Sequence, residues 1–191
     1  MTNIDYPAGP GFESESPINL PANRADAEYG SDLIAELFGE LGHDYVFLTP
    51  GSSFRGLHDS LVNFTRNHKP EIILCGHEEI AVAMGQGYAK ATGRTALVVL
   101  HDLVGVQHGL MALYNAWADR KPLVVLGGSG PQDPAERRPI DWIHSANTQC
   151  EIVRNVTKWT DEPATLQALL DSVARAQRIA SSAPQGPVYV S

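Results

Sequence analysis

The chain has 191 residues, 43% of them hydrophobic and 19% charged, which is typical of one well-packed globular domain and excludes a disordered chain. Its formal net charge of -8 opposes nucleic-acid binding, because only 14 Lys and Arg residues are present to neutralise phosphates. The apolar runs fall short of the roughly 20 residues that span a bilayer, and the N-terminus resembles no signal peptide, so we expect a cytoplasmic protein without membrane contact.

The chain begins with a segment that carries no periodic pattern. Residues 1–28 are rich in Pro, Gly, Ser and acidic residues, which indicates an extended or mobile arm. A helix follows: Ser31 is a plausible N-cap, apolar residues recur at helical spacing over 33–41, and Gly42 supplies a stop.

Beyond this helix, buried strands alternate with helices. Apolar runs predict strands at 45–48, 72–74, 97–100, 123–126 and 152–157, with helices between them at 56–67, 78–92, 106–118 and 164–180. A Pro- and Arg-containing loop covers 127–139, and a last strand begins after Gly186. This alternation predicts an α/β fold, a doubly wound parallel sheet with helices on both faces. Ligands should therefore gather after residues 48, 74, 100 and 126, where strands end.

Several familiar motifs fail in informative ways. His77-Glu78 opens an HExxH pattern, but Ala81 replaces the second histidine, so no metal site is expected on this chain. The glycine pairs lack the third glycine of a dinucleotide fingerprint, and Ser129 lacks the frame of a hydrolase elbow. Two isolated cysteines indicate buried free thiols in a reducing compartment.

One long segment does match a known pattern. Residues 77–94 (HEEIAVAMGQGYAKATGR) and 116–128 (AWADRKPLVVLGG) resemble sequence blocks of thiamin diphosphate enzymes of the acetolactate synthase type. The Thr-Lys pair at 157–158 and the Gly-Pro-Val at 186–188 extend the resemblance over residues 29–191. It implies the pyrimidine-binding domain of such an enzyme.

The resemblance assigns Glu78 as the catalytic carboxylate that hydrogen-bonds the aminopyrimidine of thiamin diphosphate and so activates the cofactor. The alternative for Glu78 is a carboxylate that only stabilises a helix start. The turn at Pro50-Gly51 matches the family's Pro-Gly turn, which makes Gly51 a cofactor-binding residue and Ser53 and His58 candidates for substrate contacts. A turn serine and a helix-surface histidine remain the alternatives.

The segment after 100 departs from the family pattern. Where many relatives carry TSGPGxxN, this chain has HDLVGVQH, keeping Gly105 for close backbone approach to the cofactor and placing His108 beside it. His101 could act as an acid or base on the substrate, and His144 is a further substrate candidate. Hydrogen-bonded core histidines are the alternative for both His101 and His108.

The resemblance also implies what lies outside these residues. The family's GDG motif, which binds Mg²⁺ and the diphosphate, is missing, so we expect a diphosphate-binding domain or subunit as partner. The sequence stops at Ser191 in or just after a strand, which fits either a longer polypeptide or a partner subunit. A homo- or hetero-oligomer, dimer or tetramer, is expected from the apolar faces of helices 78–92 and 106–118.

The predicted function is decarboxylation of a 2-oxo acid, or ligation of the resulting carbanion equivalent to a carbonyl acceptor, by a thiamin diphosphate-dependent lyase or transferase. A non-catalytic binding or regulatory module of the same fold is the alternative. A stand-alone hydrolase is disfavoured by the missing elbow motif.

Overall fold

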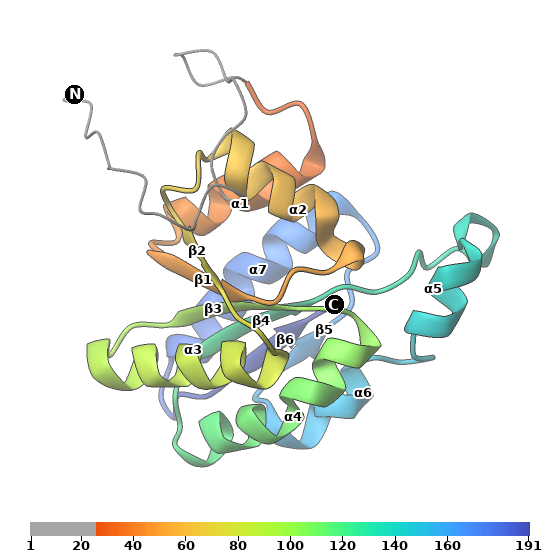
Figure 1. The fold of residues 1–191 in the computed structure, drawn as a ribbon. Coiled ribbons are helices and arrows are strands. Elements are labelled where there is room, and N and C mark those ends of the chain that lie inside the picture. Colours follow the sequence, from red (N-terminus) through yellow and green to blue (C-terminus); the bar gives the residue numbers. More distant parts are fainter. Residues whose placement is uncertain (1–25) are drawn as a thin grey trace.

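The computed structural model describes residues 26–191, and its centre is one sheet of six parallel strands (Figure 1). In chain order these are β1 (Tyr45–Leu48), β2 (Glu71–Leu74), β3 (Ala96–Leu100), β4 (Leu123–Gly127), β5 (Thr160–Asp161) and β6 (Val188–Val190). In space they follow the order β2-β1-β3-β4-β6-β5. The predicted doubly wound parallel sheet is confirmed. The predicted arm, residues 1–28, lies outside the described residues except at its end.

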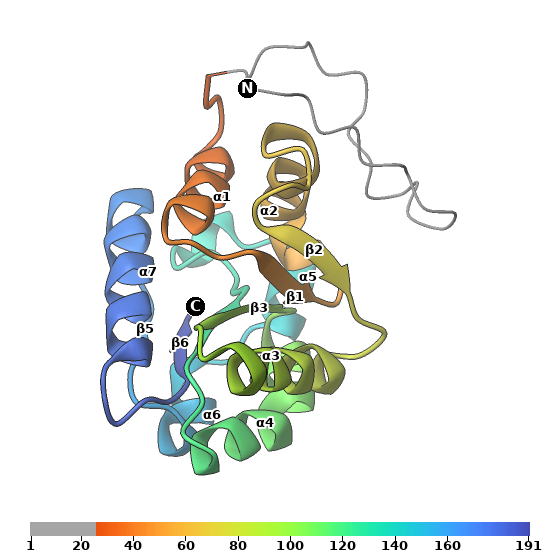
Figure 2. The ribbon, with the colours of Figure 1, turned by 90° about the vertical axis from the view of Figure 1, so that its left-hand side faces the viewer.

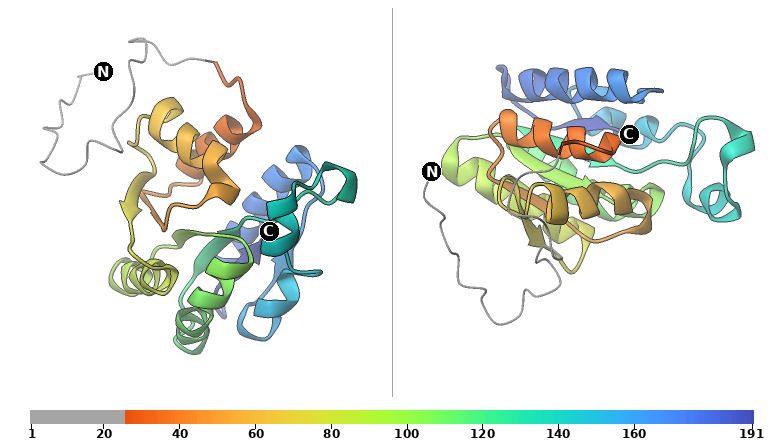
Figure 3. Two further views of the ribbon diagram at one scale, coloured as in Figure 1. Left: turned by 45° about the vertical axis from the view of Figure 1, so that its right-hand side comes forward. Right: turned by 90° about the horizontal axis from the view of Figure 1, so that it is seen from above.

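Helices cover both faces of the sheet (Figure 2). One face carries α1 (Gly30–Glu40), α2 (Arg55–Asp59) and α7 (Leu166–Ser181), and the other carries α3 (Glu78–Thr92), α4 (Leu103–Ala118) and α6 (Cys150–Val153). In the right-hand view of Figure 3, α5 (Pro139–His144) stands apart from these layers, at the end of the loop that follows β4. The short turns are η2 (Ser52–Phe54), η3 (Ser60–Phe64), η4 (Pro134–Glu136) and η5 (Arg154–Val156). Among the described helices, none combines the length and apolar character needed to cross a membrane.

The central strands are apolar along their whole length because both faces of the sheet are buried. In β3, Leu97 and Val99 pack toward α1, α2 and α7, whereas Val98 and Leu100 pack toward α3 and α4. Each of these side chains is at most 1% exposed, so each contributes about 1.5–3 kcal/mol to folding. The sheet therefore separates two hydrophobic cores and holds the strand ends rigidly.

The first helix begins differently from the prediction. Tyr29 is the N-cap of α1, and the Asp32 carboxylate accepts hydrogen bonds from the backbone N–H groups of Glu28 and Tyr29 at 3.0 and 2.9 Å. The prediction that Ser31 caps the helix is therefore wrong. Its hydroxyl instead accepts a hydrogen bond from Ser60 at 2.8 Å, which ties α1 to η3.

Two other predicted elements also differ. The predicted helix at 56–67 is α2 followed by the π-helical turn η3, and it ends where Arg66 and Asn67 adopt positive φ angles of 59° and 48°. The predicted strand at 152–157 is wrong: these residues form the end of α6 and η5. Ile152, Val153 and Val156 lie at helical spacing and pack against the core beneath α4, so burial on one helical face outweighs their β propensity.

Candidate functional site

A reversal in strand order marks the place where a ligand should bind. β2 lies on one side of β1 and β3 on the other, and in open parallel sheets such a switch point opens a crevice at the carboxyl ends of the strands. The turn with Gly51 follows β1, and His101 follows β3. A Cβ atom on Gly51 would lie 2.2 Å from His101 Cδ2, so the two loops touch and a larger side chain does not fit.

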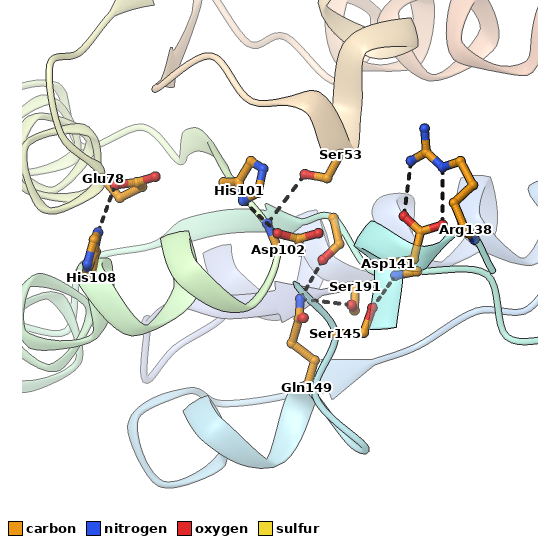
Figure 4. Close-up of polar contacts among 12 residues, drawn as sticks. Ser53, Glu78, His101, Asp102, His108, Arg138, Asp141, Ser145, Gln149 and Ser191 are labelled. Carbon is orange, nitrogen blue, oxygen red and sulfur yellow. Dashed lines mark hydrogen bonds and ion pairs between the residues drawn. The ribbon is translucent and has the colours of Figure 1, made fainter. Parts of the chain in front are cut away.

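Glu78 stands at the amino end of α3, where the helix dipole favours a carboxylate. The N-cap is His77, whose Nδ1 accepts a hydrogen bond from the backbone N–H of Glu79 at 3.1 Å. Glu78 is only 7% exposed, and its Oε2 lies 3.4 Å from Nδ1 of His108 on α4 (Figure 4). The structure thus brings together two residues that the resemblance assigns to the cofactor.

His77, Glu78 and His108 could also hold a metal ion. The two imidazole rings stack with centroids 4.9 Å apart and planes 20° from parallel. One ligand atom from each residue lies within 4.8 Å of the others, and two imidazoles with one carboxylate are a donor set of zinc sites. The sequence predicted no such cluster, because the second histidine comes from α4 rather than from the next turn of α3.

Gly105 joins this cluster to the residues that follow β3. It lies in the first turn of α4, which begins before the predicted residue 106. A Cβ atom here would lie 3.1 Å from Glu78 Cγ, 3.2 Å from Glu78 Oε1 and 3.1 Å from His101 Cβ. Gly105 therefore lies between Glu78 and His101 with no room for a side chain, and a larger residue would crowd both of them.

Asp102 is a buried carboxylate that the sequence did not single out. It is 5% exposed, and its Oδ1 lies 2.6 Å from His101 Nδ1 without a well-aligned hydrogen-bond donor. Burial raises the pKa of Asp102; His101 and His144 act in the opposite direction, and the nearby Asp141 carboxylate raises it further. The available signal was an acidic residue next to a histidine at the carboxyl end of a buried strand.

Ser53 lies close to this carboxylate, as Figure 4 shows. Its hydroxyl accepts a hydrogen bond of 3.4 Å from the backbone N–H of Asp102, and a Cβ atom on Gly128 would lie 2.5 Å from Ser53 Oγ. The loops after β1, β3 and β4 therefore meet here. His58 lies half-buried in the last turn of α2.

His144 reaches the site from α5. Its ring meets the His101 ring edge-on, with centroids 5.5 Å apart and planes at 89°. Arg138 braces α5 through hydrogen bonds to both Asp141 oxygens, at 3.2 and 3.0 Å, and this pairing lowers the pKa of Asp141. The hydroxyl of Ser145 accepts a hydrogen bond of 3.0 Å from the backbone N–H of Gly130.

A pocket of about 790 Å³ lies beside α5, beyond the ends of β4 and β6. Its lining is mainly polar and includes Gly130, Arg137, Ser145, Gln149 and Ser191, but not Glu78 or His101. Gln149 is buried, and its amide donates to the backbone oxygen of Gly128 at 2.5 Å and to the Tyr189 hydroxyl at 2.7 Å. Because these bonds tie the loop to β6, we assign the wall of this pocket to the scaffold of the site.

Comparison with known proteins identifies the family. The model for the thiamine pyrophosphate enzyme, N-terminal TPP binding domain, matches residues 29–152. The chain belongs to this family. Among its relatives, benzoylformate decarboxylase from Pseudomonas aeruginosa is 32% identical over 156 residues, which are 82% of this chain and 28% of that protein. Acetolactate synthase from Bacillus subtilis is 26% identical over 162 residues, 85% of this chain and 27% of that protein.

Structural comparison agrees with the family match. A solved structure from Mycobacterium smegmatis, assigned to the thiamin diphosphate-dependent enzymes, superposes with a TM-score of 0.76 and 27% sequence identity. The match covers 86% of this chain and 30% of that one, so the chain spans less than a third of the length of each of these relatives. The predicted resemblance to acetolactate-synthase-like enzymes, and the assignment to their pyrimidine-binding domain, are confirmed.

Proposed function

We propose that this domain activates thiamin diphosphate in an enzyme that decarboxylates a 2-oxo acid or ligates the product to a carbonyl acceptor. The observation that carries the proposal is the buried carboxylate of Glu78 at the crevice, with Gly105 packed against it. The fit to an aminopyrimidine is chemical: Oε1 faces the glycine, and the carboxylate can share a proton with a ring nitrogen. The helix dipole of α3 and the imidazole of His108 hold that carboxylate in place.

The cofactor, when bound, supplies a nucleophilic carbon that adds to a carbonyl group and accepts the electrons released by loss of CO₂. The residues of this chain would do the rest. Glu78 would hold or release the proton at the pyrimidine end. His101 would give or take a proton at the substrate oxygen. Ser53 and His144 beside it, and His58 in the last turn of α2, would be substrate contacts.

We infer that other parts of the assembly hold the diphosphate. The family resemblance places the Mg²⁺ and diphosphate ligands in a different domain or subunit, since divalent cations bind phosphate through carboxylate and amide oxygens. Exposed apolar side chains on α3 and α4 support contact with another subunit: Ile80, Met84, Met111, Tyr114 and Trp117. The free, buried thiols of Cys75 and Cys150 favour a reducing compartment such as the cytoplasm.

The experiment compares Glu78→Gln with Glu79→Gln in the complete enzyme. Glu79 is the exposed neighbour on the same helix, so the two substitutions differ in burial and in place but not in chemistry. Deuterium exchange at the reactive thiazolium carbon of added thiamin diphosphate should slow by about 10²-fold or more in Glu78→Gln and stay unchanged in Glu79→Gln. An unchanged exchange rate in Glu78→Gln would refute the assignment. Bound cofactor without turnover of any 2-oxo acid would favour a non-catalytic module.

A further inference from the structure

Asp102 occupies a helix-capping position without acting as a cap. It is the N-cap residue of α4, where an aspartate normally accepts a hydrogen bond from a backbone N–H of the first turn. Its side chain makes no such bond and turns instead toward His101. The ordinary reason for an aspartate at this position is therefore missing.

Burial makes the placement of this carboxylate costly. A buried carboxylate destabilises a fold unless charged or hydrogen-bonding partners compensate it. Oδ1 of Asp102 lacks a well-aligned donor within the described chain, and a second carboxylate, Asp141, acts on it from α5. The groups that can offset its charge are the imidazoles of His101 and His144.

We propose that Asp102 is a positioning residue that fixes the imidazole of His101 for proton transfer to or from the substrate. Nδ1 of His101 lies 2.6 Å from Oδ1, a distance that suits an ion pair although the two groups are not aligned as a hydrogen bond. The Asp102 carboxylate would therefore favour a proton on Nδ1 and leave Nε2 to exchange a proton with the substrate. The opposite ring edge, at Cδ2, lies against Gly51. Asp102 and Gly51 therefore contact the His101 ring from two sides. An imidazole that is already correctly placed loses little conformational entropy when it takes part in the reaction.

His144 completes the arrangement. Its ring meets the His101 ring edge-on, with centroids 5.5 Å apart, and the Arg138 pairing with Asp141 stabilises the first turn of the helix that carries it. Figure 4 shows Asp102 between His101 and the α5 residues that brace this helix. The three groups would form one acid–base unit at the substrate side, next to the carboxylate of Glu78 across Gly105. This inference rests on the proposed function.

The test is a double-mutant cycle in the complete enzyme, with a panel of 2-oxo acids that includes pyruvate and benzoylformate. Asp102→Asn should lower kcat by about 10²-fold with little change in KM. It should cause no further loss in an enzyme that already carries His101→Gln, because Asp102 acts through that ring. Asp171→Asn, an exposed residue on α7, is the matched control and should keep parental kinetics.

Stability and cofactor activation separate this role from a structural one. Because Asp102→Asn removes a buried charge, the melting temperature should stay equal or rise, and deuterium exchange at the cofactor should match the parent enzyme. Additive effects in the cycle, or a fall in melting temperature together with slowed exchange, would overturn the role of Asp102. An unchanged exchange rate in Glu78→Gln would instead overturn the proposed function.

Discussion

Replacement of Gly105 by alanine should damage the site without unfolding the domain. The new methyl group would lie 3.1 Å from Glu78 Cγ and from His101 Cβ, closer than ordinary carbon contacts, so both side chains must move by a few tenths of an ångström. Alanine is favoured over glycine in a helix by up to about 1 kcal/mol, which offsets part of this crowding. The free energy of unfolding should therefore change by less than about 1 kcal/mol.

Activity should respond much more strongly than stability. Misplacement of a catalytic group by a fraction of an ångström to 1 Å can cost up to about 10²-fold, so we expect turnover of 2-oxo acids to fall by roughly 10- to 10²-fold. Gln167→Ala is the control, because Gln167 is exposed on α7, on the opposite face of the sheet from α3 and α4. That variant should change the free energy of unfolding by less than about 0.5 kcal/mol and keep full turnover.

Steady-state kinetics and urea unfolding of the complete enzyme, measured for Gly105→Ala and for Gln167→Ala, test this prediction. Full turnover in Gly105→Ala, with normal cofactor binding, would refute the inference that Gly105 sets the spacing between Glu78 and His101. Equal losses in both variants would show that the helices respond to alanine in general. The expected pattern is loss of activity in Gly105→Ala alone.

Two further predictions concern stability and assembly. Burial lowers the pKa of His43 from 6.5 to about 4, so the neutral histidine contributes its full stability above pH 6.5. This contribution declines as the pH falls toward 4, by roughly 3 kcal/mol in total at about 1.36 kcal/mol per pH unit. Urea unfolding of the parent and of His43→Leu should show a fall in stability between pH 6.5 and 4.5 that is steeper in the parent, and equal slopes would contradict this. Tyr114→Glu on the exposed face of α4 should shift the assembly toward smaller species in light scattering. Gln167→Glu on α7 is the control and should leave the mass of the assembly unchanged. An intact oligomer in Tyr114→Glu would argue that this face of α4 is not an interface.

The sheet was predictable because its central strands are buried on both faces. Unbroken apolar runs such as 97–100 have few alternatives when helical stretches separate them, and the helix at 78–92 matches α3 residue for residue. The strand predicted at 152–157 was wrong because so short an apolar segment does not distinguish the spacing of a helix from that of a strand. These residues form α6 and η5 because they pack beneath α4, which is a tertiary contact.

The site was predictable only where a long motif fixed it. Glu78 follows from the block at 77–94, but its contact with His108 joins residues on two helices. The contact between the His101 and His144 rings depends on the path of the loop after β4, which positions α5, and no local sequence pattern predicts that path. Asp102 escaped notice because an aspartate before a helix normally indicates a cap, and only its geometry excludes that role.

The negative charge of the site suits binding of the pyrimidine end of the cofactor and not of its diphosphate end. Glu78 and Asp102 are both buried carboxylates, and the chain as a whole carries a formal net charge of -8. Arg138, the cation beside Asp141, is already paired with that carboxylate. Such surroundings suit proton transfer at neutral or cationic rings and disfavour a diphosphate, because like charges repel strongly where water is excluded. Under the proposed function, the polyanionic end of the cofactor would therefore take cationic or metal ligands from another part of the assembly, while this domain would supply the carboxylates and imidazoles that move protons.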